Sequence, residues 1–286
     1  MKKNILITGA SSGIGREIAI HFVKSNIWNV IATVRNELDG ESLIMKTKGL
    51  ATVVYMDIAK QRDINIASEQ VNEIVGSHGL YALINNAGIV VSGPLECLHI
   101  EAIRNQFDVN LFGAIAMTQA MLPLIRQAHG KIINIGSISG RVTLPLMGPY
   151  SASKAAFERI SMAFRSELYP WGIPVTLIEP GNFKTPIWKK SIASTKNCMA
   201  NFTIECQNRY INYLLKAEKL SNKMEKRSGD VSKLVKVIEK VLSDQKPKAK
   251  YVIGCDAYFL GLLVRFSSQE FLDFFGRCLL GFNKIK

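Results

Sequence analysis

Short apolar runs alternate with helical patterns through the first two thirds of the chain. Strands are predicted at Asn4–Thr8, Trp28–Val34, Ala51–Met56, Leu80–Asn85, Lys131–Gly136 and Val175–Ile178. Helices are predicted at Gly13–Ser25, from about Leu38, at Arg62–Gly76, from about Leu98 to Ala128 and at Tyr150–Tyr169. Several strand runs are apolar without alternation, which is typical of strands covered on both faces. The pattern predicts an α/β fold with a doubly wound parallel sheet and helices on both faces.

The pattern loosens after Pro180-Gly181. Residues 186–228 are polar, basic and weakly periodic, and a segment of this length predicts a lid or substrate-binding loop. A helix at Val231–Leu242 and a strand at Tyr251–Ile253 are predicted next. Neither an internal repeat nor a Pro/Gly/Ser-rich linker interrupts the chain, so one domain of 286 residues is expected.

The last stretch, 256–286, predicts an amphipathic helical extension. Its apolar residues recur at helical spacing, namely Phe271, Phe274, Phe275, Cys278, Leu279 and Phe282. One interpretation is a helix packed on the protein's own core or on a partner subunit. The alternatives are a lipophilic wall for a substrate, or a peripheral membrane contact helped by Arg277 and Lys284.

Charge and cysteine content narrow the function classes. The net charge is +13, and 184–250 holds sixteen Lys/Arg against six Asp/Glu. Such a region could meet nucleic acid, anionic lipid or a phosphate-bearing ligand, or could be a solvated surface. Since no nucleic-acid motif accompanies it, no nucleic-acid partner is expected. The five cysteines contain no C-x-x-C pair and the four histidines no ligand spacing, so neither a disulfide framework nor a metal site is predicted.

The opening Met-Lys-Lys-Asn-Ile-Leu-Ile resembles a signal peptide for only a few residues. Thr8-Gly9 interrupts the apolar run short of the ~7–15 residues that such a region needs. No run reaches the ~20 apolar residues of a membrane-spanning helix. A cytoplasmic protein is therefore expected.

A glycine-rich turn joins the first predicted strand to the first helix. The turn reads Thr8-Gly9-Ala10-Ser11-Ser12-Gly13-Ile14-Gly15. Glycines permit a tight turn and let the backbone approach a pyrophosphate, and the helix N-terminus offers free N–H groups to phosphates. The spacing G-x-x-x-G-x-G differs from the common dinucleotide fingerprint, but its place between strand and helix predicts a dinucleotide site.

Two positions after later strands bear on the choice of coenzyme. Arg35 stands at the end of the second strand, where an acidic residue would bind the 2′-hydroxyl of NAD. A guanidinium suits a 2′-phosphate instead, so NADP(H) is preferred. The alternative is an NAD(H)-linked protein in which Arg35 faces solvent. Asp57, after the third strand, either accepts a hydrogen bond from the adenine amine or caps the next helix.

A phenol and an ammonium lie four residues apart on one predicted helix, at Tyr150 and Lys154. A tyrosine normally loses its proton near pH ~10, and a nearby lysine charge is expected to lower that pKa. The pair can then act as a general acid/base. Ser137 ends the fifth strand, where its hydroxyl can bind a substrate oxygen, and Asn110 is a polar residue in an apolar helical run.

These residues resemble the motifs of the short-chain dehydrogenase/reductase family. The motifs are Thr8-Gly9-x-x-x-Gly13-x-Gly15, Asn85-Asn86-Ala87-Gly88, Asn110, Ser137, Tyr150-x-x-x-Lys154 and Pro180-Gly181, in the family's order. The resemblance is strong from about Lys3 to Thr185. It implies a Rossmann-type fold, with 1–185 as the cofactor-binding and catalytic core, 186–228 as the substrate lid and 256–286 as the extension.

The resemblance also implies roles for the matching residues. Tyr150 would be the general acid/base, Lys154 would bind the nicotinamide ribose and lower the pKa of Tyr150, and Ser137 would polarise the substrate oxygen. Asn110 would hold a water in a proton relay. Cofactor contacts would come from the glycine turn with Ser11, Ser12 and Ile14, and from Arg35, Asp57, Ile58, Asn86, Ala87, Gly88, Tyr150, Lys154, Pro180, Gly181, Phe183 and Thr185.

Later segments look similar to the hydroxysteroid and retinol dehydrogenases of this family. Those segments are Glu179–Thr185 and Pro247-x-Ala-x-Tyr251, before the apolar extension. The likeness implies a lipophilic steroid-, retinoid- or lipid-like alcohol or carbonyl as substrate, and a homodimer or homotetramer. The N-terminal membrane anchor of many such proteins is not expected ahead of Thr8. A non-catalytic nucleotide-sensing protein is the rival from another class, but it would be expected to lose part of the Asn/Ser/Tyr/Lys set.

Overall fold

The computed structural model describes residues 2–187, 192–193, 199 and 202–282. Within them, seven parallel strands form one sheet in the order β3-β2-β1-β4-β5-β6-β7. The strands are β1 (Lys3–Ile7), β2 (Trp28–Val34), β3 (Ala51–Tyr55), β4 (Ala82–Asn85), β5 (Lys131–Ile135), β6 (Val175–Pro180) and β7 (Lys250–Ile253). The order reverses between β1 and β4, which is where ligands bind in doubly wound folds. The predicted fold class is confirmed.

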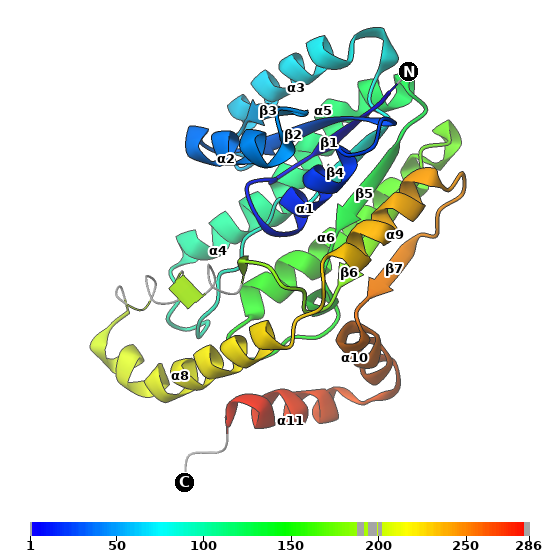
Figure 1. The fold of residues 1–286 in the computed structure, drawn as a ribbon. Helices are drawn as coiled ribbons and strands as arrows, with labels where there is room; N and C mark the ends of the chain where they lie inside the picture. The colour runs from blue at the N-terminus through cyan, green and yellow to red at the C-terminus, as the bar shows by residue number, and fades with distance from the viewer. Residues whose placement is uncertain (1, 188–191, 194–198, 200–201, 283–286) are drawn as a thin grey trace.

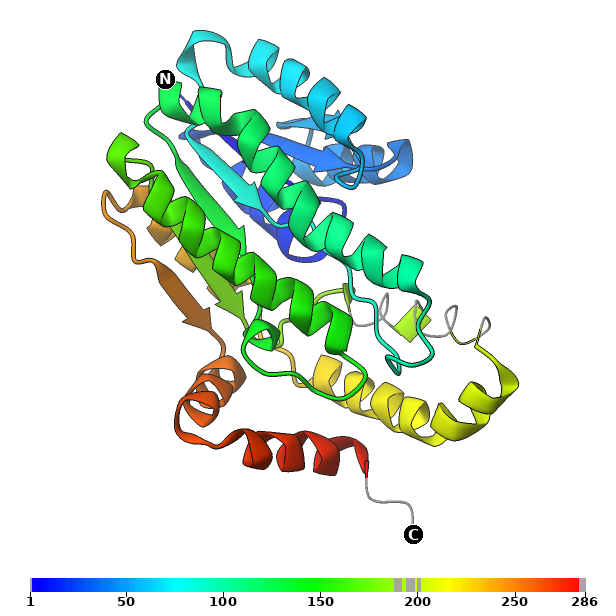
Figure 2. The ribbon, with the colours of Figure 1, turned by 180° about the vertical axis from the view of Figure 1, so that it is seen from behind.

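Helices cover both faces of the sheet (Figures 1 and 2). One face carries α1 (Gly13–Phe22), α2 (Glu37–Thr47) and α9 (Ser232–Ser243), and the other carries α3 (Gln61–Val75), α5 (Gly113–Gln127) and α6 (Gly148–Glu167). Strand β1 shows why its run is apolar without alternation. Ile5 and Ile7 enter the first core with Phe22, while Leu6 enters the second with Met117. The short helices are η1 (Gly76–His78), η3 (Ile138–Gly140) and η4 (Tyr169–Trp171).

The helical run predicted from Leu98 to Ala128 is one long helix with an irregular middle. Helix α4 (Ile100–Phe107) passes through a π-helical turn, Asp108–Phe112, into α5. By length and composition, Ile100–Gln127 could cross a membrane, but 56% of its most apolar window is buried inside the protein. Such burial is what a core helix shows, and we interpret it as one.

The C-terminal third adds helices below the carboxyl ends of the strands. They are α8 (Ile204–Lys226), α10 (Cys255–Phe266) and α11 (Gln269–Leu280), and both views place them on the same side of the sheet (Figures 1 and 2). The sequence predicts only a weakly periodic lid over 186–228, whereas 23 of its residues form α8. The periodicity is weak because α8 lies on the surface and Leu214 is its one fully buried residue. Lys284 lies outside the described residues.

Candidate active site

One cavity of about 960 Å³ opens at the carboxyl ends of the strands and reaches α8 and α11. Of the residues predicted to act there, all but Thr8, Gly15 and Asn110 line it. The lining includes Gly9, Ser11, Ser12, Gly13, Ile14, Arg35, Asp57, Ile58, Asn86, Ala87, Gly88, Ser137, Tyr150, Lys154, Pro180, Gly181, Phe183 and Thr185. The structure therefore brings into one cavity groups that lie up to 176 positions apart in the sequence (Gly9 to Thr185).

The glycine turn is shaped by close approach rather than by flexibility. Gly9 has a φ of +67°, and a Cβ there would lie 2.7 Å from the Cα of Ala87. Gly13 has a φ of +59° and faces the side chain of Thr185. Gly15 lines no cavity wall, but a Cβ on it would collide with the amide of Asn86. The turn can therefore approach a ligand closely while it packs on the loop after β4.

Thr8 and Asn86 join the glycine turn to the loop after β4. The hydroxyl of Thr8 accepts hydrogen bonds from the backbone N–H groups of Asn86 (3.0 Å) and Ala87 (3.1 Å). In return, the Asn86 amide donates to the carbonyl oxygens of Thr8 (2.9 Å) and Gly9 (3.1 Å). Thr8 thus positions the loop from beneath, which explains why it does not line the cavity itself.

Arg35 and Asp57 line the cavity where the adenosine of a dinucleotide is expected from the sequence. Arg35 is exposed and lines the cavity, and in the part of the chain that the structure describes its guanidinium has no carboxylate partner. Asp57 accepts a hydrogen bond from the N–H of Ala59 (3.2 Å) and lies 3.8 Å from the Lys60 ammonium. Its carboxylate therefore orders the turn that leads into α3, and it also faces the cavity.

A nicotinamide dinucleotide fits this half of the cavity. The glycine turn leaves the backbone uncovered where a pyrophosphate would approach the N-terminus of α1, whose first turn carries no acidic side chain. Gly13 lies next to the side chain of Thr185, and both residues line this part of the cavity. Arg35 supplies positive charge at the adenosine end. Most of the residues predicted from the sequence to hold a coenzyme line this half of the cavity.

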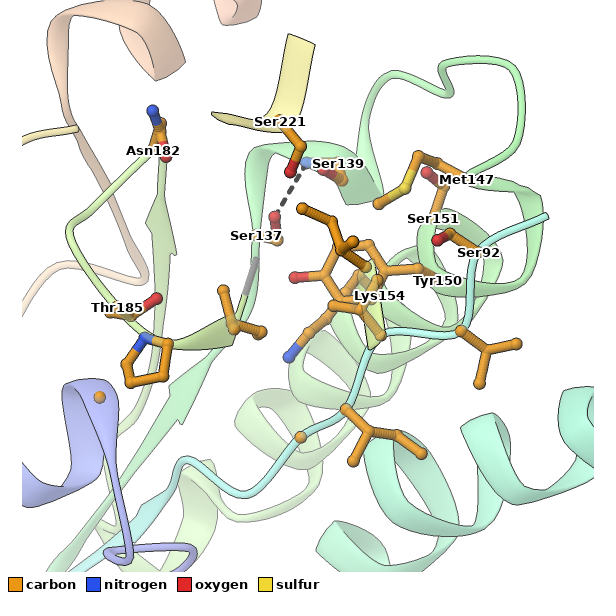
Figure 3. A pocket seen from close by; sticks show the side chains of 18 of the residues that line it. Ser92, Ser137, Ser139, Met147, Tyr150, Ser151, Lys154, Asn182, Thr185 and Ser221 are labelled. Atoms are coloured by element: carbon orange, nitrogen blue, oxygen red, sulfur yellow. Dashed lines mark hydrogen bonds between the residues drawn. The ribbon is translucent and has the colours of Figure 1, made fainter. Parts of the chain in front are cut away.

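Tyr150, Ser137 and Lys154 meet at the centre of the cavity (Figure 3). Tyr150 and Lys154 come from the first two turns of α6, and they are only 9% and 6% exposed. Ser137 follows β5 and accepts a hydrogen bond from the N–H of Ser139 (3.1 Å), which fixes its side chain. The Lys154 ammonium donates to the carbonyl oxygen of Ile135 (2.9 Å).

The pKa of Tyr150 moves opposite to the sequence-based expectation. Burial raises the pKa of the Tyr150 phenol, and a hydrogen bond with Ser137 lowers it only in part. Burial also lowers the pKa of Lys154, to about 8. The expected lowering of the Tyr150 pKa by Lys154 is therefore wrong for the protein alone, since desolvation acts on both groups. At neutral pH Tyr150 is a neutral phenol that is ready to donate a proton.

Asn110 lies behind the reacting groups, within the π-helical turn. Its side-chain oxygen accepts from the N–H of Ile89 (2.8 Å), and its amide donates to the Ile89 carbonyl (3.0 Å) and to the Ser153 hydroxyl (3.1 Å). A Cβ added to Gly88 would lie 3.4 Å from the Asn110 oxygen and 3.8 Å from the Lys154 nitrogen. Asn110 and Lys154 thus both lie beside Gly88, and the hydrogen bonds to Ile89 and Ser153 explain why a polar residue stands in this apolar helix.

The substrate end of the cavity is mostly apolar, and the sequence predicts few of its residues. The expected wall is present in Phe275 and Leu279 of α11, whereas Phe271 and Phe274 are exposed. Further lining comes from Val142, Leu144, Leu146, Met147, Ile211, Leu214, Leu215, Leu220, Leu260 and Leu280. The residues of α8 reach the cavity because the helix lies over the strand ends, and the sequence alone does not show this position. Among these walls, the buried hydroxyl oxygens of Ser151 and Ser221 have no hydrogen-bond partner.

Helix α8 is fastened to the loop before α4. Cys97 and Cys206 form a disulfide with a Cα–Cα distance of 6.3 Å, so the prediction of no disulfide is wrong. The 109 residues between the two cysteines explain why spacing gives no sign of it. Arg209 also pairs with Glu96 (3.0 Å), and hydrogen bonds from Tyr210 and Arg209 lower the pKa of Glu96.

A charge cluster behind Ser137 was not predicted. Glu179 of β6 is 1% exposed and pairs with Arg141, four residues after Ser137, and with Lys250 (3.3 Å). Lys250 also pairs with Glu158 of α6. The cluster connects the Ser137 loop, two strands and the helix that carries Tyr150. It thereby holds two of the reacting side chains in register.

Comparisons with known proteins agree with this geometry. The family described as short chain dehydrogenase matches residues 3–196. Retinol dehydrogenase 7 of Rattus norvegicus is 36% identical over 268 residues, which are 91% of this chain and 83% of the rat protein. An NADPH-dependent 3-dehydrocapnine reductase of Ornithobacterium rhinotracheale is 33% identical over 254 residues, covering 87% of each chain.

Among solved structures, a short-chain dehydrogenase from Streptomyces avermitilis superposes with a TM-score of 0.74 and 27% identity, covering 92% of each chain. The resemblance to retinol and hydroxysteroid dehydrogenases is confirmed. The chain belongs to the short-chain dehydrogenase/reductase family and is an oxidoreductase that acts on alcohol or carbonyl groups.

Proposed function

We propose that this protein interconverts a lipophilic carbonyl compound and its alcohol with NADP(H) as the preferred coenzyme. The observation that carries the proposal is the single cavity, which runs from Arg35 past Tyr150 to the apolar helices α8 and α11. One end is polar and built from strand ends, and the other is apolar and built from the C-terminal helices and the loop before α6. A steroid-, retinoid- or lipid-like substrate suits the apolar end.

In this mechanism the coenzyme supplies or accepts the hydride, and the chain handles the proton. During reduction, the neutral Tyr150 phenol donates its proton to the developing alkoxide. The Ser137 hydroxyl donates a hydrogen bond to the same oxygen. Lys154 and Asn110, which both lie beside Gly88, form the start of a path that returns a proton to Tyr150. In oxidation the proton moves the other way.

Two observations support the preference for NADP(H). Arg35 is exposed at the cavity edge and has no carboxylate partner in the described part of the chain, so its charge remains available for a 2′-phosphate. One of the bacterial relatives is named for its dependence on NADPH. The alternative is an NAD(H)-linked enzyme in which Arg35 faces solvent.

A substrate panel tests the proposal. Purified protein is assayed with NADPH against long-chain ketones, a steroid ketone, retinal, and small polar sugars. We expect turnover of the lipophilic compounds only. Turnover confined to sugars or polyols would overturn the lipophilic assignment, and no turnover with NADPH beside turnover with NADH would overturn the coenzyme assignment.

We also propose that the protein touches membranes at their surface through α10 and α11. Exposed apolar side chains on these helices include Phe259, Phe266 and Phe274, and Arg265 and Arg277 lie among them. Such a face suits anionic lipid headgroups. In vesicle flotation we expect binding to phosphatidylglycerol vesicles, and loss of binding when Phe266 and Phe274 are both replaced by Ser. Equal behaviour of both proteins would contradict the proposal.

A homo-oligomer is the last part of the proposal, and it rests on the family alone. Light scattering coupled to gel filtration measures the mass directly. We expect two or four times the chain mass of 31.7 kDa. A mass equal to one chain at the assay concentration would contradict the homo-oligomer. It would not affect the proposed reaction.

A further inference from the structure

The hydroxyl of Ser221 is a buried polar group without a partner in a largely apolar setting. Ser221 lies on α8 and lines the cavity, and its oxygen is out of contact with water and makes no hydrogen bond. Buried hydroxyls are normally hydrogen-bonded, because an unsatisfied one destabilises the fold. An unpaired hydroxyl inside a ligand cavity indicates that an atom of the ligand supplies its missing hydrogen-bond partner.

The direction of the side chain shows which part of a ligand it would meet. Figure 3 shows the Ser221 oxygen directed from α8 into the cavity, toward the side where Ser137 lies. Ser137 and Tyr150 will hold the oxygen that reacts. A hydroxyl that reaches the cavity from α8 is separate from this pair and can meet another atom of the substrate.

Ser151 also has an unpartnered hydroxyl, but its place on α6 argues against the same role. It follows Tyr150 directly, so on an α-helix its side chain is rotated by about 100° around the helix axis. When Tyr150 faces the reacting oxygen, Ser151 cannot face the same point. Ser221 comes from another element and has no such restriction.

We propose that Ser221 determines substrate specificity by hydrogen-bonding a second oxygen atom on the carbon next to the reacting carbonyl. This inference rests on the proposed function, because it describes the substrate of the same site. The substrate is then a lipophilic compound with two neighbouring oxygens, such as a hydroxyketone, rather than a simple ketone. Simple ketones would leave the buried hydroxyl unpaired.

The experiment compares two probes that differ by one oxygen, 2-decanone and 1-hydroxy-2-decanone, both with NADPH. For Ser221→Ala we expect kcat/KM to fall by about five- to thirty-fold with the hydroxyketone, the value of one or two buried hydrogen bonds, and to stay unchanged with 2-decanone. Ser228→Ala is the matched control, since the Ser228 hydroxyl bonds to the carbonyl of Glu225 at the end of the same helix. It should change neither value.

A second readout separates substrate binding from a structural role. Because the Ser221 hydroxyl has no partner in the free protein, Ser221→Ala should leave the melting temperature unchanged or raise it, whereas loss of a structural hydrogen bond would lower it. An equal loss with both probes, no loss with either, or a lower melting temperature would overturn the role of Ser221 alone. A wild-type protein that reduces neither probe would overturn the role of Ser221, and one that also reduces no lipophilic compound of the substrate panel would overturn the proposed function itself.

Discussion

The two ends of the cavity are built on different principles. At the coenzyme end, the lining comes from turns at strand ends, where backbone contacts fix each position: Gly9 lies against Ala87, and Thr8 bonds to Asn86. At the substrate end, the lining comes from side chains on α8, α10 and α11, helices that pack at the edge of the fold. The first end is fixed by backbone contacts between neighbouring strand ends. The second can change its lining without disturbing the sheet.

This difference separates the residues that carry out the reaction from the residues that select the substrate. Tyr150, Ser137 and Lys154 lie between the two ends, on elements that the buried Glu179 cluster holds together. Substitutions at the coenzyme end should therefore change coenzyme affinity or turnover, and substitutions on α8 should change substrate selection. Each of the following variants tests one side of that division.

The largest effect is expected at Tyr150, which lies between the coenzyme end and the substrate end. Replacing Tyr150 by Phe removes the proton donor and should lower kcat by about 10²–10⁴-fold, the usual contribution of general acid/base catalysis. NADPH affinity, measured by fluorescence titration, should be unchanged because the ring remains. Retention of full turnover by this variant would show that Tyr150 is not the acid.

At the coenzyme end, Arg35→Ala should weaken NADPH binding by about 10–100-fold through loss of charge-assisted hydrogen bonds, and leave NADH binding unchanged. Lys46→Ala removes an exposed charge from the nearby helix α2 and is the control. Calorimetric titration of both coenzymes provides the measurement. A parallel loss for NADPH and NADH would assign Arg35 a general electrostatic role.

At the substrate end, Leu214→Ala should raise KM for a lipophilic ketone and lower the free energy of unfolding by about 2–3 kcal/mol, since Leu214 is buried and lines the cavity. Leu234→Ala, in the core on the far face of the sheet, should cost similar stability without changing KM. Urea unfolding and steady-state kinetics of the two variants separate the effect of α8 on substrate binding from a general loss of stability. A change of KM in both variants would contradict the assignment of substrate selection to the α8 side of the cavity.

The smallest effect concerns pH and Lys154. Its folded pKa of about 8 lies below the unfolded value, so the unfolded chain binds more protons between the two, and stability rises with pH in that window. Between pH 7.5 and 9.5 the unfolding free energy of the wild type should gain about 2 kcal/mol over that of Lys154→Met. Urea titrations of both proteins without coenzyme measure this, and a wild-type gain no larger than that of the variant would place the lysine in solvent.

How far the sequence predicts the structure depends on the same division. The strands, the glycine turn and the cluster of Ser137, Tyr150 and Lys154 follow from patterns that local sequence carries. The helix α8 does not, because its mostly exposed residues leave little hydrophobic periodicity. Neither do the Cys97–Cys206 pair nor the Glu179 cluster, since both join residues far apart in the chain. The prediction of a lowered Tyr150 pKa is wrong, because sequence spacing reveals the neighbouring lysine charge but does not reveal that the phenol is buried.

The π-helical turn at Asp108–Phe112 makes chain length itself part of the active site. A π turn accommodates one residue more than an α-helical path of the same rise, so it marks a position where the chain carries an insertion. Deleting a residue here would let a regular α-helix form with α4 and α5 still in place, but it would redirect the side chains inside the turn. The Asn110 amide would leave Ile89 and Ser153 although its identity had not changed. An enzyme of this kind could thus be inactivated by length alone, with every named side chain still present.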